Sequence, residues 1–176
     1  MNSPEHHTAQ STAANPRISF TIRPARESDT AVILQLIREL AAYERLLDEV
    51  TATEAGLRQQ LFGPRPMAEV LLAEVDGAVA GFALFFHNFS TFVGKPGLYL
   101  EDIFVRPEYR GRGIGREFFR RLARLALERD CGRMEWAVLN WNQPALEFYR
   151  ALGAVPMSDW IVQRLTRDGI ARLADG

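Results

Sequence analysis

Residues 98–115 read LYLEDIFVRPEYRGRGIG, and this stretch decides the fold of the chain. The apolar run that ends at Val105 predicts a β-strand, and Ile114, Phe118 and Leu122 recur at helical spacing after the glycines. A strand that turns directly into a helix leaves unpaired backbone N–H groups at the helix start, where the helix dipole also favours negative charge. The stretch therefore predicts a binding site for the pyrophosphate of a nucleotide-derived cofactor.

The spacing of Gly111, Gly113 and Gly115 distinguishes this turn from two common nucleotide-binding loops. These glycines alternate strictly, whereas the dinucleotide-binding fingerprint has two residues between its second and third glycines, and the ATPase loop needs Gly-Lys-Ser/Thr. Glycine allows positive φ and places no Cβ between the backbone and a phosphate oxygen, so consecutive amides can point inward. From spacing alone, a turn that merely links strand and helix remains an alternative.

Composition predicts one folded domain. The chain has 176 residues with 47% hydrophobic content, enough for a single substantial core. No apolar run approaches the roughly 20 residues that span a bilayer, and residues 1–17 lack the pattern of a secretory signal, so we expect a cytoplasmic protein without membrane association. Cys131 is the only cysteine, which excludes an intramolecular disulfide and leaves no zinc-type cluster, so no metal site is expected.

Polar residues 1–17 show no periodicity and predict a flexible leader, so we expect the folded domain to cover residues 18–176. Two helices are expected early in the domain. Ser28 or Asp29 can cap the first, which ends near Tyr43, and Thr51 with Glu54 resembles a capping box for the second. The remaining elements alternate between strand-like and helical patterns: strands at 18–23, 68–75, 78–88 (after an Asp76-Gly77 hairpin turn), 98–105, 133–139 and 160–166, and helices at 114–129 and 142–152.

The charge pattern bears on nucleic acid as a partner. The net charge of -1 argues against a globally basic nucleic-acid binder, although arginines crowd residues 106–133. Arg116, Arg120 and Arg124 follow one helical face, which is the ordinary pattern of a solvated amphipathic helix. We therefore expect no nucleic-acid partner. DNA binding through this helix is the alternative, and steeply salt-dependent retention on DNA would identify it.

Two motifs together resemble a known family. The pattern R-x-x-G-x-G at Arg110, Gly113 and Gly115, following the LEDIFV strand, resembles the acetyl-coenzyme A signature of the GCN5-related N-acetyltransferase (GNAT) superfamily. The segment from Asn142 to Gly153 matches the N-x-x-A-x-x-F-Y-x-x-x-G segment of that family. The blocks IRELAAYE, YLEDIFVRPEYRGRGIG and LNWNQPALEFYRALGA are similar to its diamine and thialysine acetyltransferase branch.

This resemblance implies a fold, an activity and a cosubstrate. The implied fold is the α/β GNAT fold, with a central mixed, mostly antiparallel β-sheet flanked by helices, over residues 18–176. The implied activity moves an acetyl group from acetyl-CoA to a primary amine of a small cationic substrate, such as a diamine, a polyamine or a lysine analogue. The implied assembly is a homodimer. Alternatives are a GNAT protein acting on another amine (an amino acid, an antibiotic or a protein) and a non-catalytic acyl-CoA sensor.

The same resemblance assigns residues to the cofactor. It implies that the backbone of Ile103, Phe104 and Val105 pairs with the pantetheine arm, whose amides can extend a splayed sheet edge. Asn142 is also a good helix N-cap ahead of Pro144. The remaining implied contacts are Arg110, the pyrophosphate cradle of Gly111, Arg112, Gly113, Ile114, Gly115 and Arg116, the segment Asn142, Gln143, Pro144 and Ala145, and Tyr149.

Two side chains are candidates for proton transfer. An alkylamine has a pKa of about 10, and only its neutral form attacks a thioester. The resemblance implies that Glu101 accepts the amine proton and that Tyr149 protonates the leaving thiolate. Strand alternation places Glu101 and Asp102 on opposite faces unless a bulge intervenes. A Glu101–arginine ion pair and a core-packed Tyr149 are the structural alternatives. No base is spaced to activate Cys131, so direct attack is expected.

Substrate selection involves further residues. By resemblance, Tyr43 and Glu44 lie near the amine, and Asp159 and Trp160 correspond to an acidic-aromatic pair of the branch. Ser90 stands where polyamine-acetylating members carry a carboxylate. A long polycation needs several spaced acidic groups, so this change favours a smaller amine, such as a lysine analogue or a short diamine.

Overall fold

The computed structural model describes residues 19–176, so the predicted leader at residues 1–17 lies outside the described residues. The described chain divides after Ala137 into two compact units, residues 19–137 and Val138–Gly176. The first unit holds every strand assigned within the described residues and three of the α-helices, and the second holds two short α-helices.

A five-stranded β-sheet forms the centre of the first unit, and its strands lie in chain order. β1 to β4 pair antiparallel with their neighbours, and β5 runs parallel to β4. The expected mixed, mostly antiparallel sheet is therefore confirmed. The strands are β1 (Phe20–Pro24), β2 (Glu69–Val75), β3 (Ala78–Ser90), β4 (Lys95–Val105) and β5 (Arg133–Trp136).

The turn between β2 and β3 is the hairpin that the sequence predicts. Asp76 and Gly77 both have positive φ, at 49° and 80°. Two consecutive residues with positive φ form the turn whose twist matches that of the flanking strands, and Asp-Gly favours it. The predicted hairpin is confirmed.

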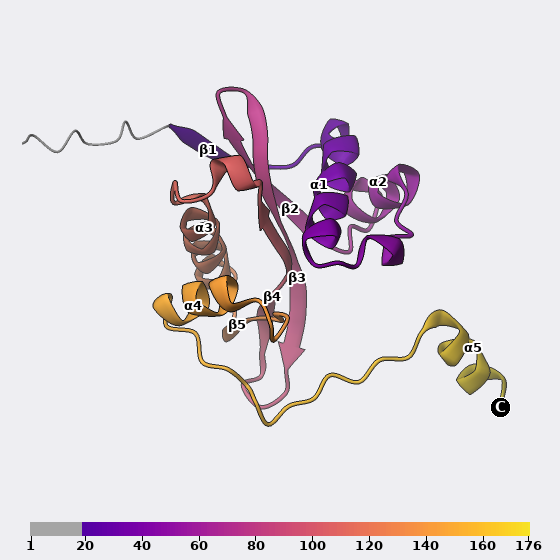
Figure 1. Ribbon diagram of the computed structural model, residues 1–176. Helices are drawn as coiled ribbons and strands as arrows, with labels where there is room; N and C mark the ends of the chain where they lie inside the picture. The colour runs from indigo at the N-terminus through magenta and orange to yellow at the C-terminus, as the bar shows by residue number, and fades with distance from the viewer. Residues whose placement is uncertain (1–18) are drawn as a thin grey trace, which may run out of the picture. The chain divides into compact units, whose positions relative to one another are not determined.

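Helices cover both faces of the sheet (Figure 1). α1 (Thr30–Tyr43) and α2 (Glu54–Phe62) lie on one face, where Phe82 and Phe104 join their core cluster. α3 (Ile114–Glu128) lies on the other face and buries one stripe of apolar side chains, which an amphipathic helix presents every three or four residues. Its arginine-rich stripe is exposed, as expected of a solvated face: Arg116, Arg120 and Arg124.

The cap of α2 differs from the prediction. Thr53, rather than Thr51, is the N-cap, and its Oγ1 accepts a hydrogen bond from the backbone N–H of Gly56 at 3.1 Å. The sequence TATEAG offers two threonines, and the helix begins directly after the second one, so the side chain of Thr53 can accept from the amide of Gly56, the third residue of the helix. The capping box assigned to Thr51 and Glu54 is therefore wrong, although the helix itself is confirmed and ends at Gly63.

The second unit contains α4 (Gln143–Ala151) and α5 (Arg167–Asp175). Asn142 caps α4 as predicted, because its side chain accepts a hydrogen bond from Ala145 N–H at 3.4 Å. The strand predicted at residues 160–166 is wrong, since this stretch has no ladder partner within the described residues. Apolar composition suggested that strand, but a strand exists only where another strand accepts its backbone hydrogen bonds.

The strand predicted at residues 133–139 is shorter in the structure, since β5 ends at Trp136. Across residues 19–176, no helix combines the length and the apolar character needed to cross a membrane.

Candidate active site

The turn after β4 has the geometry of an anion cradle. Gly111 and Gly113 have φ of 74° and 86°, in the left-handed region that glycine adopts without strain. A Cβ built on either residue meets no heavy atom within 4 Å, so the space above this backbone is open. Gly113 is also the N-cap residue of α3, which directs the turn into the start of the helix.

The first turn of α3 leaves backbone donors for a ligand. The first intrahelical hydrogen bond runs from Glu117 N–H to the carbonyl of Gly113 at 3.0 Å. The amides of residues 114–116 therefore precede the hydrogen-bonded ladder, at the positive end of the helix dipole. Backbone N–H groups at a helix start bind phosphate oxygens, so the cradle predicted at residues 111–116 is compatible with the pyrophosphate of acetyl-CoA.

Arg110 has a specific place beside this turn. Its Nε donates to the carbonyl of Val105 at 2.8 Å, and its guanidinium carbon lies 4.9 Å from the ring centre of Tyr43 and 5.5 Å from that of Phe104. The side chain thus ties the turn to the end of β4 and to the end of α1. A second arginine of the turn, Arg112, has its guanidinium carbon 5.5 Å from the ring centre of Tyr109.

One edge of β4 is open where the pantetheine arm is expected. β3 pairs with the whole length of β4 on one side, but on the other side β5 pairs only with Gly97 to Leu100. Within residues 19–137, no strand pairs with the second edge from Glu101 to Val105. This edge includes Ile103, Phe104 and Val105. It offers backbone groups that an amide-containing ligand can use as a neighbouring strand would.

A β-bulge in β4 corrects the predicted arrangement of the acidic residues. Leu84 pairs with Asp102 and Phe85 pairs with Leu100, so Glu101 is the extra residue on β4. A bulge changes the alternation of side chains along a strand. Asp102 therefore shares a face with Tyr99 rather than with Leu100. A bulge was the one exception that the alternation prediction allowed, and β4 contains it.

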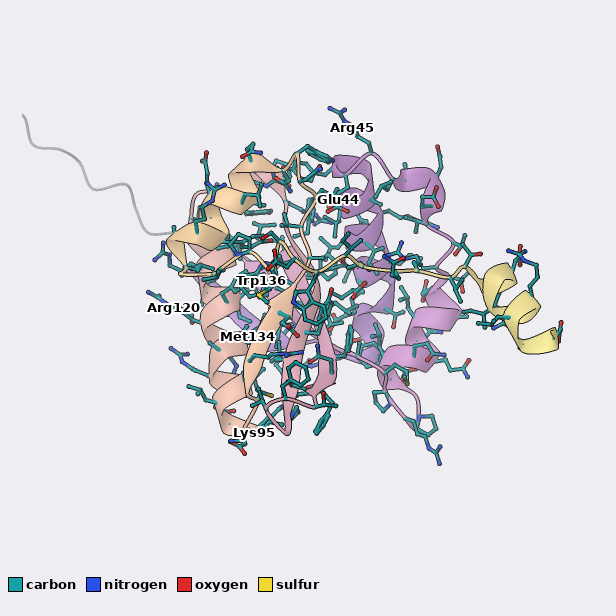
Figure 2. All side chains as sticks on the ribbon, turned by 90° about the horizontal axis from the view of Figure 1, so that it is seen from below. Glu44, Arg45, Lys95, Arg120, Met134 and Trp136 are labelled. Carbon is teal, nitrogen blue, oxygen red and sulfur yellow. The ribbon has the colours of Figure 1, made fainter. Side chains whose placement is uncertain are left out.

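Two carboxylates act on the pKa of a third at the bulge. Burial first, and then the negative charges of Glu101 and Glu44, together raise the pKa of Asp102 to about 6. Burial also raises the pKa of Glu44, which follows the last residue of α1 (Figure 2). Glu101 is exposed. The structure thus brings the predicted residues Glu44 and Glu101 together with Asp102, and this acidic site attracts a cation.

The remaining predicted residues belong to the second unit. Tyr149 lies on α4, where its ring centre is 5.6 Å from that of Phe148. Asn142 is buried, whereas Gln143 and Pro144 are exposed and Ala145 is half-buried. Asp159 and Trp160 lie in the irregular segment between α4 and α5, and Trp160 is 71% exposed. The roles of these residues remain predictions.

Comparison with known proteins agrees with the motifs. The sequence pattern of the acetyltransferase (GNAT) family matches residues 33–154. A thialysine N-epsilon-acetyltransferase of Bos taurus is 41% identical over 164 residues, covering 87% of this chain and 96% of that protein. An L-ornithine N5-acetyltransferase of Arabidopsis thaliana is 32% identical and covers 95% and 93%, respectively. A solved integron cassette protein of V. cholerae superposes with a TM-score of 0.76 at 26% identity, covering 90% of this chain and 99% of that one.

The fold and the cradle define an acyltransferase that uses a coenzyme A thioester. The chain belongs to the acetyltransferase (GNAT) family. The structure adds Asp102 and Tyr99 to the candidate site. The sequence did not select Asp102, because alternation placed it opposite Glu101 and the resemblance favoured Glu101. The only signal in the sequence was the adjacent Glu-Asp pair, since nothing in LYLEDIFV marks the position of a bulge.

Proposed function

We propose that this acetyltransferase moves the acetyl group of acetyl-CoA to a primary amine of a small cationic substrate by direct attack. The observation that carries the proposal is the acidic site at the bulge of β4, on the same strand whose end leads into the anion cradle. Relatives named for thialysine and ornithine acetylation support a small amine, as does the spermidine/spermine acetyltransferase-like protein of Homo sapiens at 36% identity.

The cosubstrate would be held mainly by the backbone. The amides of residues 111–116 bind the pyrophosphate, the open edge of β4 at Ile103 to Val105 binds the pantetheine amides, and residues 142–145 add contacts. Bound acetyl-CoA supplies an activated thioester carbonyl. In this arrangement the binding energy orients the acetyl group relative to the acidic site, which contributes to rate through proximity.

Two side chains would each transfer one proton. Glu101 binds the ammonium and accepts its proton, directly or through water, so that the neutral amine can attack. Tyr149 Oη donates a proton to the departing sulfur. The resemblance also assigns Tyr43, Glu44, Asp159 and Trp160 to the amine substrate. Because the pKa of Asp102 is raised to about 6, its negative charge, and hence its attraction for a cation, develops as the pH rises through that value.

A direct test measures thiol release from acetyl-CoA with a panel of small amines. We expect amine-dependent release, and we expect Glu101→Gln to lower kcat by about 100-fold at neutral pH, since a general base contributes about that much. The matched control is Glu108→Gln, an exposed carboxylate in the turn Pro107–Tyr109 outside the acidic site. Tight binding of acetyl-CoA without thiol release for any amine would favour the sensor alternative instead.

We further propose a cytoplasmic homodimer. The support is the resemblance to the branch, together with apolar side chains of the second unit that lie exposed in the single chain, including Ile161 at 81% and Val162 at 79%. Sedimentation equilibrium tests the dimer, and a monomer at micromolar concentration would contradict it.

A further inference from the structure

The sheet face beyond the acidic site carries a fixed pair of opposite charges. Arg133 Nε lies 2.9 Å from Glu135 Oε2 on β5. The ring centre of Trp136, which Figure 2 labels, is 4.9 Å from that of Phe119 on α3, in an edge-on arrangement, so Trp136 lies on the α3 side of this strand. Because side chains alternate along a strand, Arg133 and Glu135 face the opposite side. This pair has no role in the proposed mechanism.

The strand register places the pair beside the acidic site. β5 runs parallel to β4, with Glu135 next to Tyr99 and Arg133 next to Gly97. Tyr99 shares its face with Asp102 as a result of the bulge. The register thus places Glu135 beside Tyr99, and Glu101 lies two residues further along the same strand. Burial raises the pKa of Tyr99, and the negative charges of Glu101 and Glu135 act in the same direction.

The distance along the sheet suits a short substrate. Glu135 is displaced from Glu101 by two residues along the strand and by one strand across the sheet. With a rise of about 3.3 Å per residue and a strand spacing of about 4.8 Å, the backbone positions are about 8 Å apart. A small molecule with two charged ends can therefore reach both sites.

Neighbouring residues hold the pair in place. Gly97 has no side chain, so Asn88 on β3 crosses over it and donates from Nδ2 to Glu135 Oε2 at 2.9 Å. A Cβ at Gly97 would collide with Asn88 Oδ1. Arg133 Nη1 donates to Ser90 Oγ at 3.1 Å. Both contacts of Glu135 use Oε2, so Oε1 remains available to a further donor, and the guanidinium retains N–H groups for an anion.

Such a pair complements a zwitterion rather than a second cation. The guanidinium forms bidentate hydrogen bonds with carboxylates, and the carboxylate of Glu135 suits an ammonium group. Arg133 also occupies the neighbourhood of Ser90, so a second ammonium group there would meet a like charge. A diamine or polyamine offers no carboxylate to this arginine. The main-chain end of an amino acid carries both groups side by side.

We propose that Arg133 and Glu135 form a specificity subsite for the main-chain end of an amino-acid substrate, in which the α-carboxylate binds Arg133 and the α-ammonium binds Glu135. This inference rests on the proposed function and narrows its substrate class. The terminal amine lies at the acidic site of Glu101 and Asp102, and Tyr99 lies between the two ends. Arg133 and Glu135 are specificity-determining residues that do not touch the reacting atoms.

The test compares amino acids with their decarboxylated forms, ornithine with putrescine and lysine with cadaverine, by thiol release from acetyl-CoA. The two members of each pair differ only in the carboxylate. We expect kcat/KM to be at least about 10-fold higher for the amino acid. In Arg133→Gln, KM for the amino acid rises about 10-fold or more with kcat little changed, because only uniform binding is lost, and the diamine gains or keeps its kcat/KM.

Two further variants control for folding. Ser90→Asp keeps Arg133 but neutralises it with a nearby carboxylate, and it should shift preference in the same direction toward the diamine. Arg124→Gln removes an exposed arginine of α3 and should leave kcat/KM unchanged for both the amino acid and the diamine. Equal or better use of the diamine by the unmodified protein, or an equal loss for both substrates in Arg133→Gln and Ser90→Asp, would overturn the inference alone. Turnover of neither compound nor of any other amine would refute the proposed function as well.

Discussion

The anion cradle and the acidic site lie on the same stretch of chain, but they are built from different groups. The cradle at residues 111–116 uses backbone amides, and its residues need only permit the right φ angles. The acidic site uses the side chains of Glu44, Glu101 and Asp102, which come from two elements and depend on a bulge. A backbone site is visible in the sequence as a glycine pattern, whereas a side-chain site depends on how strands and helices are placed.

Replacement of Gly113 by valine tests the backbone side of this comparison and should have the largest effect. A β-branched side chain at φ 86° is strained and stands where the amides meet the diphosphate. With the loss of two hydrogen bonds to a charged group, we expect acetyl-CoA to bind about 1,000-fold more weakly, measured by calorimetry. Gly77→Val, at φ 80° in the β2–β3 hairpin, is the matched control with similar strain. If both variants lost the same affinity for acetyl-CoA, the loss would reflect backbone strain in general and not a cofactor site at Gly113.

Tyr149→Phe removes one hydroxyl and tests whether a side chain can affect turnover without affecting the backbone site. We expect kcat to fall about 100-fold, because a general acid contributes at least that much, while the affinity for acetyl-CoA changes little. Stopped-flow thiol release and calorimetry measure the two quantities separately. A parallel loss of affinity and turnover would assign Tyr149 to cofactor binding alone.

Asp102→Asn tests the acidic site through the pH dependence of the free energy of unfolding. The folded-state pKa of Asp102 is raised to about 6, above the value of about 4 in an unfolded chain, so ionisation of this group costs stability as the pH rises through that window. The variant should therefore gain up to about 2 kcal/mol at pH 8, allowing for solvent screening, and nothing at pH 3.5. Urea unfolding at both pH values checks this, with exposed Asp76→Asn as the control. A gain that is the same at both pH values would show that Asp102 is not buried against other charges.

The double variant Arg120→Gln and Arg124→Gln should have the smallest effect. Both side chains are about 60% exposed, and each forms an ion pair with Glu117, at 3.3 and 3.8 Å. Exposed ion pairs contribute little, so we expect less than about 0.5 kcal/mol of change in unfolding free energy and unchanged KM for acetyl-CoA. A large rise in that KM would show that arginine side chains of α3 also bind acetyl-CoA. The cofactor site could then no longer be described as a backbone site.

Much of the fold followed from local patterns. The Asp76-Gly77 turn, the helix over Thr30–Tyr43 and the Asn142 cap were predicted because each depends on residues close in sequence. The N-cap of α2 is Thr53 rather than the predicted Thr51. Both residues are threonines two positions apart, and residue type alone does not show at which of them the helix begins. The predicted strand at 160–166 failed because strand formation depends on a partner that the segment itself does not contain.

The sequence by itself determined the family, the glycine turn and the candidate residues Glu101 and Tyr149, since each lies in a contiguous motif. Only the tertiary structure decided that Asp102 shares a face with Tyr99, that β4 has an open edge at Ile103 to Val105, and that Arg133 and Glu135 lie beside the acidic site. The physical reason is that strand pairing brings distant segments together, and one extra residue in a strand changes which side chains meet.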